Sequence, residues 1–382
     1  MAQHIFISCG ELSGEIHARH LARTLRQLRP EIRLSGLGGE LLRAEGVDCV
    51  ADSTELRIMG FGDVAKKYFT FRRVLNDCVD HIRGNGVDTV VLVDYPGFHA
   101  RLAAALRRQA PGVRIIQYIC PKFWAWNYRR VRKMPYLYDQ VLCILPFEKE
   151  LLDREGVPGT FVGNPLLDEL DFSETGAALR RDLHLAPDAK LVGIFPGSRE
   201  GEIRRHAPLV ARCVDRIQTA IPDVTCVVAV APGMDADMLG RASGELWTPT
   251  VIENRAHELM AASTALLAKS GTTTLEAALF GAPMVVFYQL SWFAWQVFSM
   301  FRRVRHVSLP NLIACEFDPA QPEPVVPEFI GPEATPDACA DALCAMLAAP
   351  QQRETLRRRL LELRTRLGGA GASRRAAQVI LA

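Results

Sequence analysis

The chain has 382 residues, of which 49% are hydrophobic, so it can bury a large core and is long enough for two domains of ordinary size. Its 45 Lys and Arg residues nearly balance 43 Asp and Glu residues, and the net charge of +2 argues against nucleic acid as a bulk partner. The ten cysteines show no CxxC pair and no Cys/His spacing typical of zinc or of a disulfide framework. We therefore expect buried thiols in a reducing compartment.

The N-terminal segment MAQHIFISCGELSGE has no basic n-region, and its apolar stretch is too short for a signal peptide. No stretch approaches the roughly 18 uninterrupted apolar residues that a membrane-spanning helix needs. The sequence thus predicts a cytoplasmic protein that can lie on a membrane surface but does not cross it.

Short apolar runs alternate with helical patterns along the chain, which predicts βαβ units and parallel sheets, the α/β class. The runs predicted as strands are 5–9, 89–93, 115–119, 141–145, 191–195, 225–231, 265–268 and 284–288. Residues 168–190 between the two sets are polar and show no strand pattern, so we place a linker there. This divides the chain into an N-terminal domain (1–167), the linker (168–190), a C-terminal domain (191–350) and C-terminal helices (351–382).

The first predicted strand of each half opens into a loop and a helix. GELSGE at Gly10 follows the strand of the first half, but it lacks the GxGxxG spacing, so a dinucleotide is not expected. PGSREGEI at Pro196 follows the strand of the second half. Two nucleotide-binding-like halves in one chain predict two facing Rossmann-like domains with an interdomain cleft.

A carboxylate, Asp94, ends the buried strand at 89–93 within the sequence VDYPGF. Because parallel α/β sheets bind ligands beyond the carboxyl ends of their strands, Asp94 is expected to face the cleft. It could serve there as a catalytic base. The structural alternative is an aspartate that caps the following helix.

Three stretches group aromatic with basic residues, at 61–83, 120–130 and 292–305. Such stretches suit a membrane headgroup interface or acyl chains. The alternative is that the aromatic side chains pack in the core or in a dimer contact. Large apolar patches are rare on soluble monomers, so three such clusters in one chain indicate a membrane surface as a candidate partner.

Gly197, Ser198 and Arg199 follow the strand at 191–195. Glycine lets the backbone approach a ligand closely, and the forked guanidinium of Arg199 suits phosphate oxygens. A surface arginine beside a turn is the alternative interpretation.

In KSGTTTLE, a strand ends, a turn of small residues follows and a helix begins. Ser270, Gly271, Thr272 and Thr273 would hold a diphosphate with free backbone N–H groups, hydroxyls and the positive end of the helix dipole. An ordinary helix cap is the alternative. Glu276, one turn into the helix, could accept both hydroxyls of a ribose or could be a capping-box residue. Two such loops in one half favour phosphate binding.

Taken together and in order, these motifs resemble those of the lipid-A-disaccharide synthase family. The similar stretches are GELSGE at Gly10, MGFGDV at Met59, VDYPGF at Val93, CPKFWAWNYRRV at Cys120, LPFEKELLDREGVPGTFVGNPLLD at Leu145, FPGSREGEI at Phe195, KSGTTTLEAALFGAPMVVFY at Lys269 and SLPNLIA at Ser308. They cover nearly the whole chain to about residue 330. The tryptophan motif, PFEKE and SLPN are specific, whereas a general glycosyltransferase would share only the Ser270 loop.

The resemblance implies a GT-B fold with an acceptor-binding N-terminal domain and a UDP-sugar-binding C-terminal domain. It also implies final helices that cross back to the first domain and, as is often the case in the family, a homodimer formed by exchange of C-terminal parts. It also implies a peripheral enzyme of the inner membrane that joins UDP-2,3-diacylglucosamine to 2,3-diacylglucosamine 1-phosphate by inversion and releases UDP, with no cofactor. Carried over residue by residue, it makes Asp94 the candidate base and adds Asn311 to the UDP-binding set. The residues expected to bind the acceptor are Glu11, Ser13, Gly14 and Trp124.

Some positions depart from the family's pattern. Four residues differ from those common in the family, and they affect the expected acceptor contacts more than the donor contacts. They are Glu15 in place of Asp, Gly97 in place of Asp, His99 in place of Asn and Asn164 in place of His. The link after SLPNLIA is lengthened by residues 315–324, which bears on loop geometry near the diphosphate.

No metal is required in this scheme, because the helix dipole and Arg199 can offset the diphosphate charge. Two other functions fit the same residues. One is a UDP-N-acetylglucosamine 2-epimerase, which would share the fold and the UDP site. The other is a non-catalytic lipid or nucleotide carrier at the membrane surface.

Overall fold

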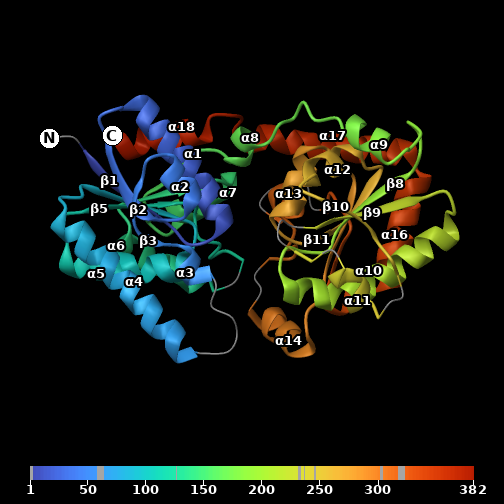
Figure 1. Ribbon diagram of the computed structural model, residues 1–382, viewed down its shortest axis with the longest axis horizontal. Helices are drawn as coiled ribbons and strands as arrows, with labels where there is room; N and C mark the ends of the chain where they lie inside the picture. The colour runs from blue at the N-terminus through green and yellow to red at the C-terminus, as the bar shows by residue number, and fades with distance from the viewer. Residues whose placement is uncertain are drawn as a thin grey trace. The chain divides into compact units, whose positions relative to one another are not determined.

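The computed structural model describes residues 3–57, 64–125, 127–230, 234–235, 237–244, 247–301, 304–316 and 323–382. The motif at Met59, with Phe61, Trp126, Arg302 and Arg303, lies outside these ranges, as does much of the 315–324 insertion. The chain forms two compact units, one comprising Met1–Glu169 with Leu367–Ala382 and the other Leu170–Arg366. Each unit is a parallel sheet with helices on both faces (Figure 1).

The first unit contains a seven-stranded sheet in the order β3-β2-β1-β4-β5-β6-β7. Its strands are β1 His4–Cys9, β2 Arg33–Gly38, β3 Asp48–Asp52, β4 Thr89–Val93, β5 Arg114–Tyr118, β6 Gln140–Cys143 and β7 Gly159–Phe161. The central strands β1 and β4 are buried throughout, as expected when helices cover both faces of a parallel sheet. The chain order reverses between β1 and β4, which pair in parallel with Cys9 opposite Val93. Such switch points are where α/β sheets bind ligands.

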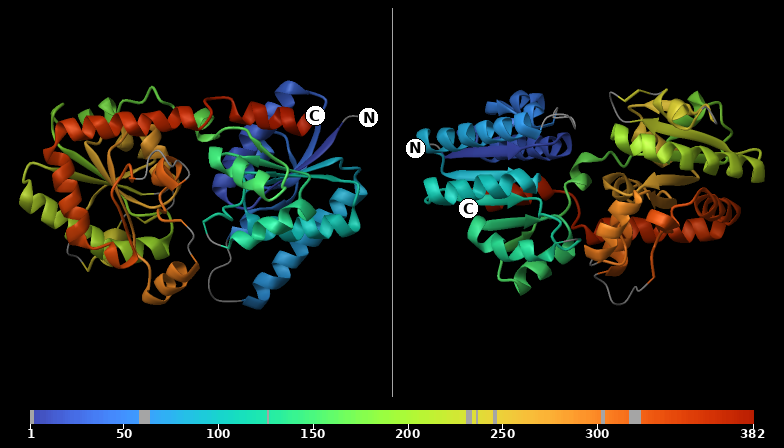
Figure 2. Two further views of the ribbon diagram at one scale, coloured as in Figure 1. Left: turned by 180° about the vertical axis from the view of Figure 1, so that it is seen from behind. Right: turned by 90° about the horizontal axis from the view of Figure 1, so that it is seen from below.

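The helices of the first unit include the last helix of the chain. They are α1 Leu12–Leu28, α2 Glu40–Ala44, α3 Thr54–Arg57, α4 Val64–Gly84, α5 Pro96–Gln109, the 3₁₀ helix η1 Tyr128–Lys133, α6 Met134–Leu137, α7 Pro146–Arg154, α8 Leu166–Glu169 and α18 Ala372–Leu381. Helix α18 packs against α1 (Figure 2). Arg114 holds it by donating to the carbonyl oxygens of Ile380 and Val379 at 3.0 and 3.1 Å. The C-terminal segment therefore completes a fold that the N-terminus begins.

The second unit contains a six-stranded parallel sheet in the order β10-β9-β8-β11-β12-β13. Its strands are β8 Leu191–Phe195, β9 Thr225–Val230, β10 Thr250–Glu253, β11 Ala265–Lys269, β12 Met284–Tyr288 and β13 Glu328–Ile330. The order reverses between β8 and β11, where Phe195 pairs with Ala268. The loops that follow these two strands therefore leave the sheet side by side at a second switch point.

The helices of the second unit are α9 Ala177–Asp182, α10 Glu200–Ala220, α11 Met238–Ala242, α12 Ala256–Ala262, α13 Thr272–Leu279, α14 Trp292–Phe301, α15 Leu309–Asn311, the π-helical turn η2 Leu312–Glu316, the 3₁₀ turn η3 Gly331–Glu333, α16 Pro336–Ala348 and α17 Pro350–Arg366. The core of this unit joins the buried faces of α10 and α16 to the central strands. Helix α10 is amphipathic, and its apolar residues, such as Ile203, Val210 and Ile217, recur at helical spacing.

The prediction of two Rossmann-like domains with parallel sheets is confirmed. Each of the eight predicted apolar runs overlaps one strand of the expected half. The strands without a prediction are β2, β3, β7, β10 and β13. These are edge strands, short strands or, in β2, a strand with two glycines, and none of them carries a continuous apolar run.

Candidate active site

Gly197, Ser198 and Arg199 form the turn between β8 and α10. Arg199 is exposed and caps α10, where its carbonyl oxygen accepts from the backbone N–H groups of Glu202 and Ile203 at 2.9 and 3.0 Å. Gly197 has a φ of 136°, and a Cβ built on it would lie 2.8 Å from Glu202 Oε2. Only glycine fits this conformation and this close approach.

Ser270 to Thr273 form the turn between β11 and α13. Ser270 is buried and donates its backbone N–H to the carbonyl of Phe287 at 2.9 Å. Thr274 closes the first turn of the helix, because its backbone N–H and its hydroxyl both donate to the Gly271 carbonyl, at 3.2 and 2.7 Å. Thr272 is exposed at the helix start. First-turn N–H groups lack acceptors within a helix, so this end suits an anion such as a diphosphate.

An ion pair that the sequence interpretation missed joins these two turns. Lys269 Nζ lies 3.0 Å from Glu202 Oε1, and the two side chains are only 17% and 11% exposed. Glu202 Oε2 also accepts from the backbone N–H of Ser198 at 3.4 Å. The neighbouring His206 is buried and donates from Nδ1 to the carbonyl of Pro196 at 2.6 Å, and its burial lowers its pKa. The only signal in the sequence was that Lys269 and Glu202 each lie within one of the two motifs.

Glu276 lies one turn into α13, as expected. Its Oε2 is 3.2 Å from His257 Nε2, and the imidazole stacks on Phe280 with 5.6 Å between ring centroids. The carboxylate is partly exposed and has an oriented neighbour. This geometry is compatible with the expected contact to a ribose.

Asn311, expected to bind UDP, is fully buried with its carboxamide engaged by the chain itself. Its Oδ1 accepts from the backbone N–H groups of Val325 and Val326, and its Nδ2 donates to the Val326 carbonyl and to Glu328 Oε2. Glu328 also accepts from the backbone N–H groups of Val307 and Ser308 at 2.6 and 2.9 Å. In the structure Asn311 and Glu328 hold the SLPN loop, and direct contact of Asn311 with UDP remains a prediction.

Asp94 stands at the switch point of the first sheet, immediately after β4. It is half-buried, its φ is 52°, and its backbone N–H donates to the carbonyl of Tyr118 at 3.0 Å. Tyr95 continues the left-handed turn with a φ of 44° and has a raised pKa because of burial and the nearby charge of Glu11.

The first turn of α1 runs against the Asp94 turn. A Cβ on Gly14 would lie 3.4 Å from the Val93 carbonyl oxygen and 3.7 Å from Asp94 Cβ, so Gly14 permits the approach of the helix. Glu11 and Ser13 are exposed at the start of α1. The structure therefore brings together Asp94 and three of the four residues expected to bind the acceptor.

Trp124, the fourth, lies in the core of the first unit with 2% of its surface exposed. Its indole N–H donates to Glu148 Oε1 at 3.1 Å, and its ring packs edge-on against Phe147. Phe123 is also buried, so the described aromatic side chains of the 120–130 cluster are mainly core residues rather than an interface. A role of Trp124 in acceptor binding remains a prediction.

Glu148 belongs to a buried cluster that the sequence interpretation missed. Its Oε2 accepts from the backbone N–H of Leu145 at 3.1 Å, and burial raises its pKa to about 7. Its carboxylate and the thiols of Cys120 and Cys143 all lie within 4.8 Å of one another. Within the described ranges this is the one group of side chains close enough to share a metal ion.

Two of the positions that depart from the family pattern serve the fold. Glu15 is buried and accepts at Oε1 from the backbone N–H groups of Gly39 and Leu41, at 2.8 and 3.1 Å. Asn164 is buried and accepts at Oδ1 from the N–H of Leu166 at 3.1 Å. Both hold the start of a short helix.

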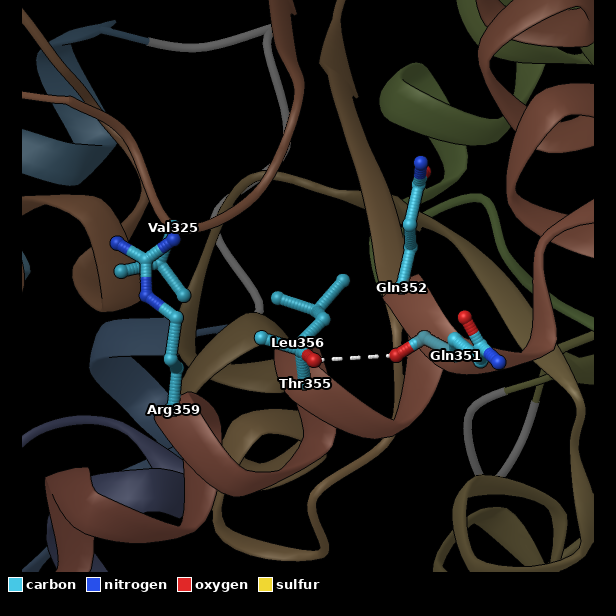
Figure 3. Close-up of a pocket in the computed structure, with 6 residues that line it drawn as sticks. All are labelled: Val325, Gln351, Gln352, Thr355, Leu356 and Arg359. Atoms are coloured by element: carbon cyan, nitrogen blue, oxygen red, sulfur yellow. Dashed lines mark hydrogen bonds between the residues drawn. The ribbon is translucent and has the colours of Figure 1, made fainter.

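A hollow of about 390 Å³ lies on the second unit beside α17 (Figure 3). It is lined by Val325, Gln351, Gln352, Thr355, Leu356 and Arg359. It contains none of the residues expected to bind the donor, so it does not define the candidate site.

The described part of the chain has no helix that is both long enough and apolar enough to cross a membrane.

Two Rossmann-like units, each built on a parallel sheet with a switch point, define the GT-B class of fold. Solved structures with this fold include a UDP-GlcNAc 2-epimerase from Neisseria meningitidis bound to UDP-GlcNAc, with a TM-score of 0.66 and 13% identity over 100% of both chains. Another is CalG4, the calicheamicin glycosyltransferase, with a TM-score of 0.58 and 15% identity over 100% of this chain and 98% of that one. At such identities the likeness shows the fold alone.

The sequence comparisons identify the family. The model of the family described as lipid-A-disaccharide synthetase matches residues 5–382. The lipid-A-disaccharide synthase of Myxococcus xanthus is 36% identical over 378 residues, which is 99% of this chain and 96% of the relative. That of Geobacter metallireducens is 33% identical over 387 residues, with 99% and 97% covered. The chain belongs to the lipid-A-disaccharide synthase family and is a glycosyltransferase of lipid A biosynthesis, which confirms the expectation from its motifs.

Proposed function

We propose that the chain transfers a diacylglucosaminyl group from UDP-2,3-diacylglucosamine to the 6-hydroxyl of 2,3-diacylglucosamine 1-phosphate, with inversion at C1. The observation that carries this proposal is the pair of turns after β8 and β11, joined by Lys269 and Glu202, within a chain of this family. Those turns follow the adjacent strands β8 and β11 and present Arg199 and the start of α13. They suit the diphosphate of a sugar nucleotide.

The donor is held by its nucleotide part. The first-turn N–H groups of α13 and the hydroxyls of Thr272 and Thr273 bind diphosphate oxygens, and Arg199 adds a charge-assisted hydrogen bond. Glu276 accepts from the ribose hydroxyls. When the C1–O bond breaks, these groups stabilise the negative charge that develops on the departing UDP.

The acceptor is activated by Asp94 of the first unit. Its carboxylate takes the proton of the acceptor 6-hydroxyl while that oxygen forms the new bond to C1. The electron pair of the C1–O bond leaves with UDP, so the step balances without a cofactor. Glu11, Ser13 and Gly14 at the start of α1 surround the acceptor beside Asp94.

Acylated substrates require access to lipid, and α14 supports this part of the proposal. Trp292 and Phe293 are 75% and 72% exposed, and Val297 and Met300 are also exposed. The helix carries no charged residue and projects from the second unit (Figure 1). Such a face suits the acyl boundary of a membrane surface. In the first unit, Tyr68 and Phe69 of α4 are exposed as well.

Other aromatic residues of the same clusters pack inward. Phe71 packs on Phe98 with 5.0 Å between centroids, and Trp295 lies against Gly331. Only part of the clusters at 61–83 and 292–305 therefore supports membrane docking.

The homodimer implied by the family resemblance belongs to the same proposal, and sedimentation of the purified chain tests it.

A UDP-release assay tests the reaction. Purified enzyme with both acylated substrates in mixed micelles should release one UDP for each acceptor consumed, and either substrate alone should give none. Conversion of unacylated UDP-N-acetylglucosamine in the absence of acceptor would favour the epimerase instead.

A further inference from the structure

The backbone beyond β4 and β5 is held in an unfavourable conformation. Asp94, Tyr95 and Ile119 have φ values of 52°, 44° and 71°, in the left-handed region that residues with a Cβ avoid. A β-branched residue such as Ile119 is especially rare there. Such conformations persist only where the surrounding structure holds them, and they concentrate at functional sites.

Two buried side chains hold this turn through one atom, the carbonyl oxygen of Asp94. His99 Nδ1 lies 2.6 Å from it and Gln117 Nε2 lies 3.3 Å from it. The same Gln117 nitrogen lies 3.2 Å from the carbonyl oxygen of Ile119. His99 and Gln117 are both fully buried. Gln117 therefore ties the strained turn after β4 to the strained end of β5, and His99 holds the same Asp94 oxygen from α5.

The direction of the His99 hydrogen bonds follows from chemistry. A carbonyl oxygen can only accept, so Nδ1 of His99 carries the proton. Nε2 of the neutral ring is then an acceptor, and the Ser8 hydroxyl, 2.9 Å away, donates to it. Ser8 belongs to β1, so the chain of bonds runs from β1 through His99 of α5 to the end of β4.

We propose that His99 and Gln117 form a buried clamp on the Asp94 carbonyl that fixes the left-handed turn and thereby aims the Asp94 carboxylate at the acceptor hydroxyl. His99 is then a positioning residue of the transfer reaction. This inference rests on the proposed role of Asp94 as the base. Small displacements of a reacting group can cost about 10²-fold in rate, so the clamp has a measurable consequence.

The chain supplies a matched control in a second buried histidine. His4 is also buried, with 3% of its surface exposed. Its Nε2 lies 2.8 Å from the Ser35 hydroxyl, and its Nδ1 lies 3.0 Å from the Asn85 carbonyl oxygen. It begins β1, at the end of the strand opposite to Cys9 and the α1 loop. A substitution of His4 therefore removes the hydrogen bonds of a buried histidine but leaves the contacts of Asp94 in place.

The test compares His99→Leu, His99→Asn and His4→Leu in the full-length enzyme. His99→Leu should lower kcat by about 10²-fold while UDP affinity and the acceptor KM stay within about threefold of wild type. His99→Asn should recover most of kcat, because its amide nitrogen, like Nδ1, is two bonds from Cβ and can donate to the same carbonyl. His4→Leu should lose thermal stability but keep kcat.

Two results would overturn the clamp: a folded His99→Leu with wild-type kcat, or equal kcat losses in His99→Leu and His4→Leu. If His99→Leu does not fold, Ser8→Ala against Ser35→Ala asks the same question, and only Ser8→Ala should lower kcat. Asp94→Asn separates the two proposals. If it is inactive and His99→Leu is normal, only the clamp fails; if Asp94→Asn is active, the proposed base fails and the clamp fails with it.

Discussion

Lys269 Nζ lies 3.0 Å from Glu202 Oε1, and this ion pair joins the two turns assigned to the donor diphosphate. Because both side chains are largely shielded, removal of one leaves the other charge poorly compensated. A double-mutant cycle of Lys269→Met and Glu202→Gln should give a coupling free energy of about 1–3 kcal/mol in urea unfolding. The exposed pair Arg204–Glu200 on α10 is the control and should give about 0.5 kcal/mol or less. Equal couplings would contradict the view that the inner pair organises the site.

Arg199→Ala should weaken UDP binding by roughly 1.5–3 kcal/mol, because a charge-assisted contact to the diphosphate is lost. Arg204→Ala changes a residue of α10, the helix that Arg199 caps; because Arg204 is paired with Glu200, this variant should leave UDP affinity unchanged. Isothermal calorimetry with UDP measures both. Unchanged UDP affinity in Arg199→Ala would count against the donor-site assignment.

His99 should make the fold sensitive to acid. Burial lowers its pKa from the ordinary 6.5 to about 4. Between these values the unfolded chain binds a proton that the folded chain does not, so stability falls as the pH falls from 6.5 to 4. The contribution is fully present above pH 6.5 and amounts to about 3 kcal/mol.

Urea unfolding of wild type and His99→Asn at pH 7 and pH 4.5 measures this contribution, because the other titrating groups are common to both proteins. The stability difference should shift in favour of His99→Asn at the lower pH. A pH-independent difference would show that His99 is charged or accessible in the folded enzyme.

The fold could be predicted because the central strands are continuous apolar runs, and the phosphate-suited turns could be located because glycine and hydroxyl residues follow those runs. The Lys269–Glu202 pair, the Asn311–Glu328 contacts and the His99 bonds could not, since each joins segments whose proximity only the sheet order determines. Trp124 shows the converse limit. Its motif marks it as special, but the sequence does not distinguish a buried tryptophan bonded to Glu148 from one that touches a ligand.

Membrane docking through α14 predicts that the double variant Trp292→Ser, Phe293→Ser binds anionic liposomes more weakly than wild type. Gln296→Ser, an exposed polar position on the same helix, is the control and should bind normally. Salt should weaken wild-type binding, because the basic residues that follow α14 in the sequence, such as Arg305, would meet anionic headgroups. Flotation that is equal in all three proteins and insensitive to salt would remove α14 from the docking surface.

We propose above all that this enzyme forms a tetraacyl disaccharide phosphate with Asp94 as the base. Mass spectrometry of the products from UDP-2,3-diacylglucosamine and 2,3-diacylglucosamine 1-phosphate tests it directly, with wild type and Asp94→Asn, each with and without a chelator. Wild type should form the disaccharide and UDP in both conditions. Asp94→Asn, folded and still able to bind UDP, should be slower by about 10²–10⁴-fold. A folded, UDP-binding wild type that forms no disaccharide, or an Asp94→Asn variant with normal turnover, would contradict the account.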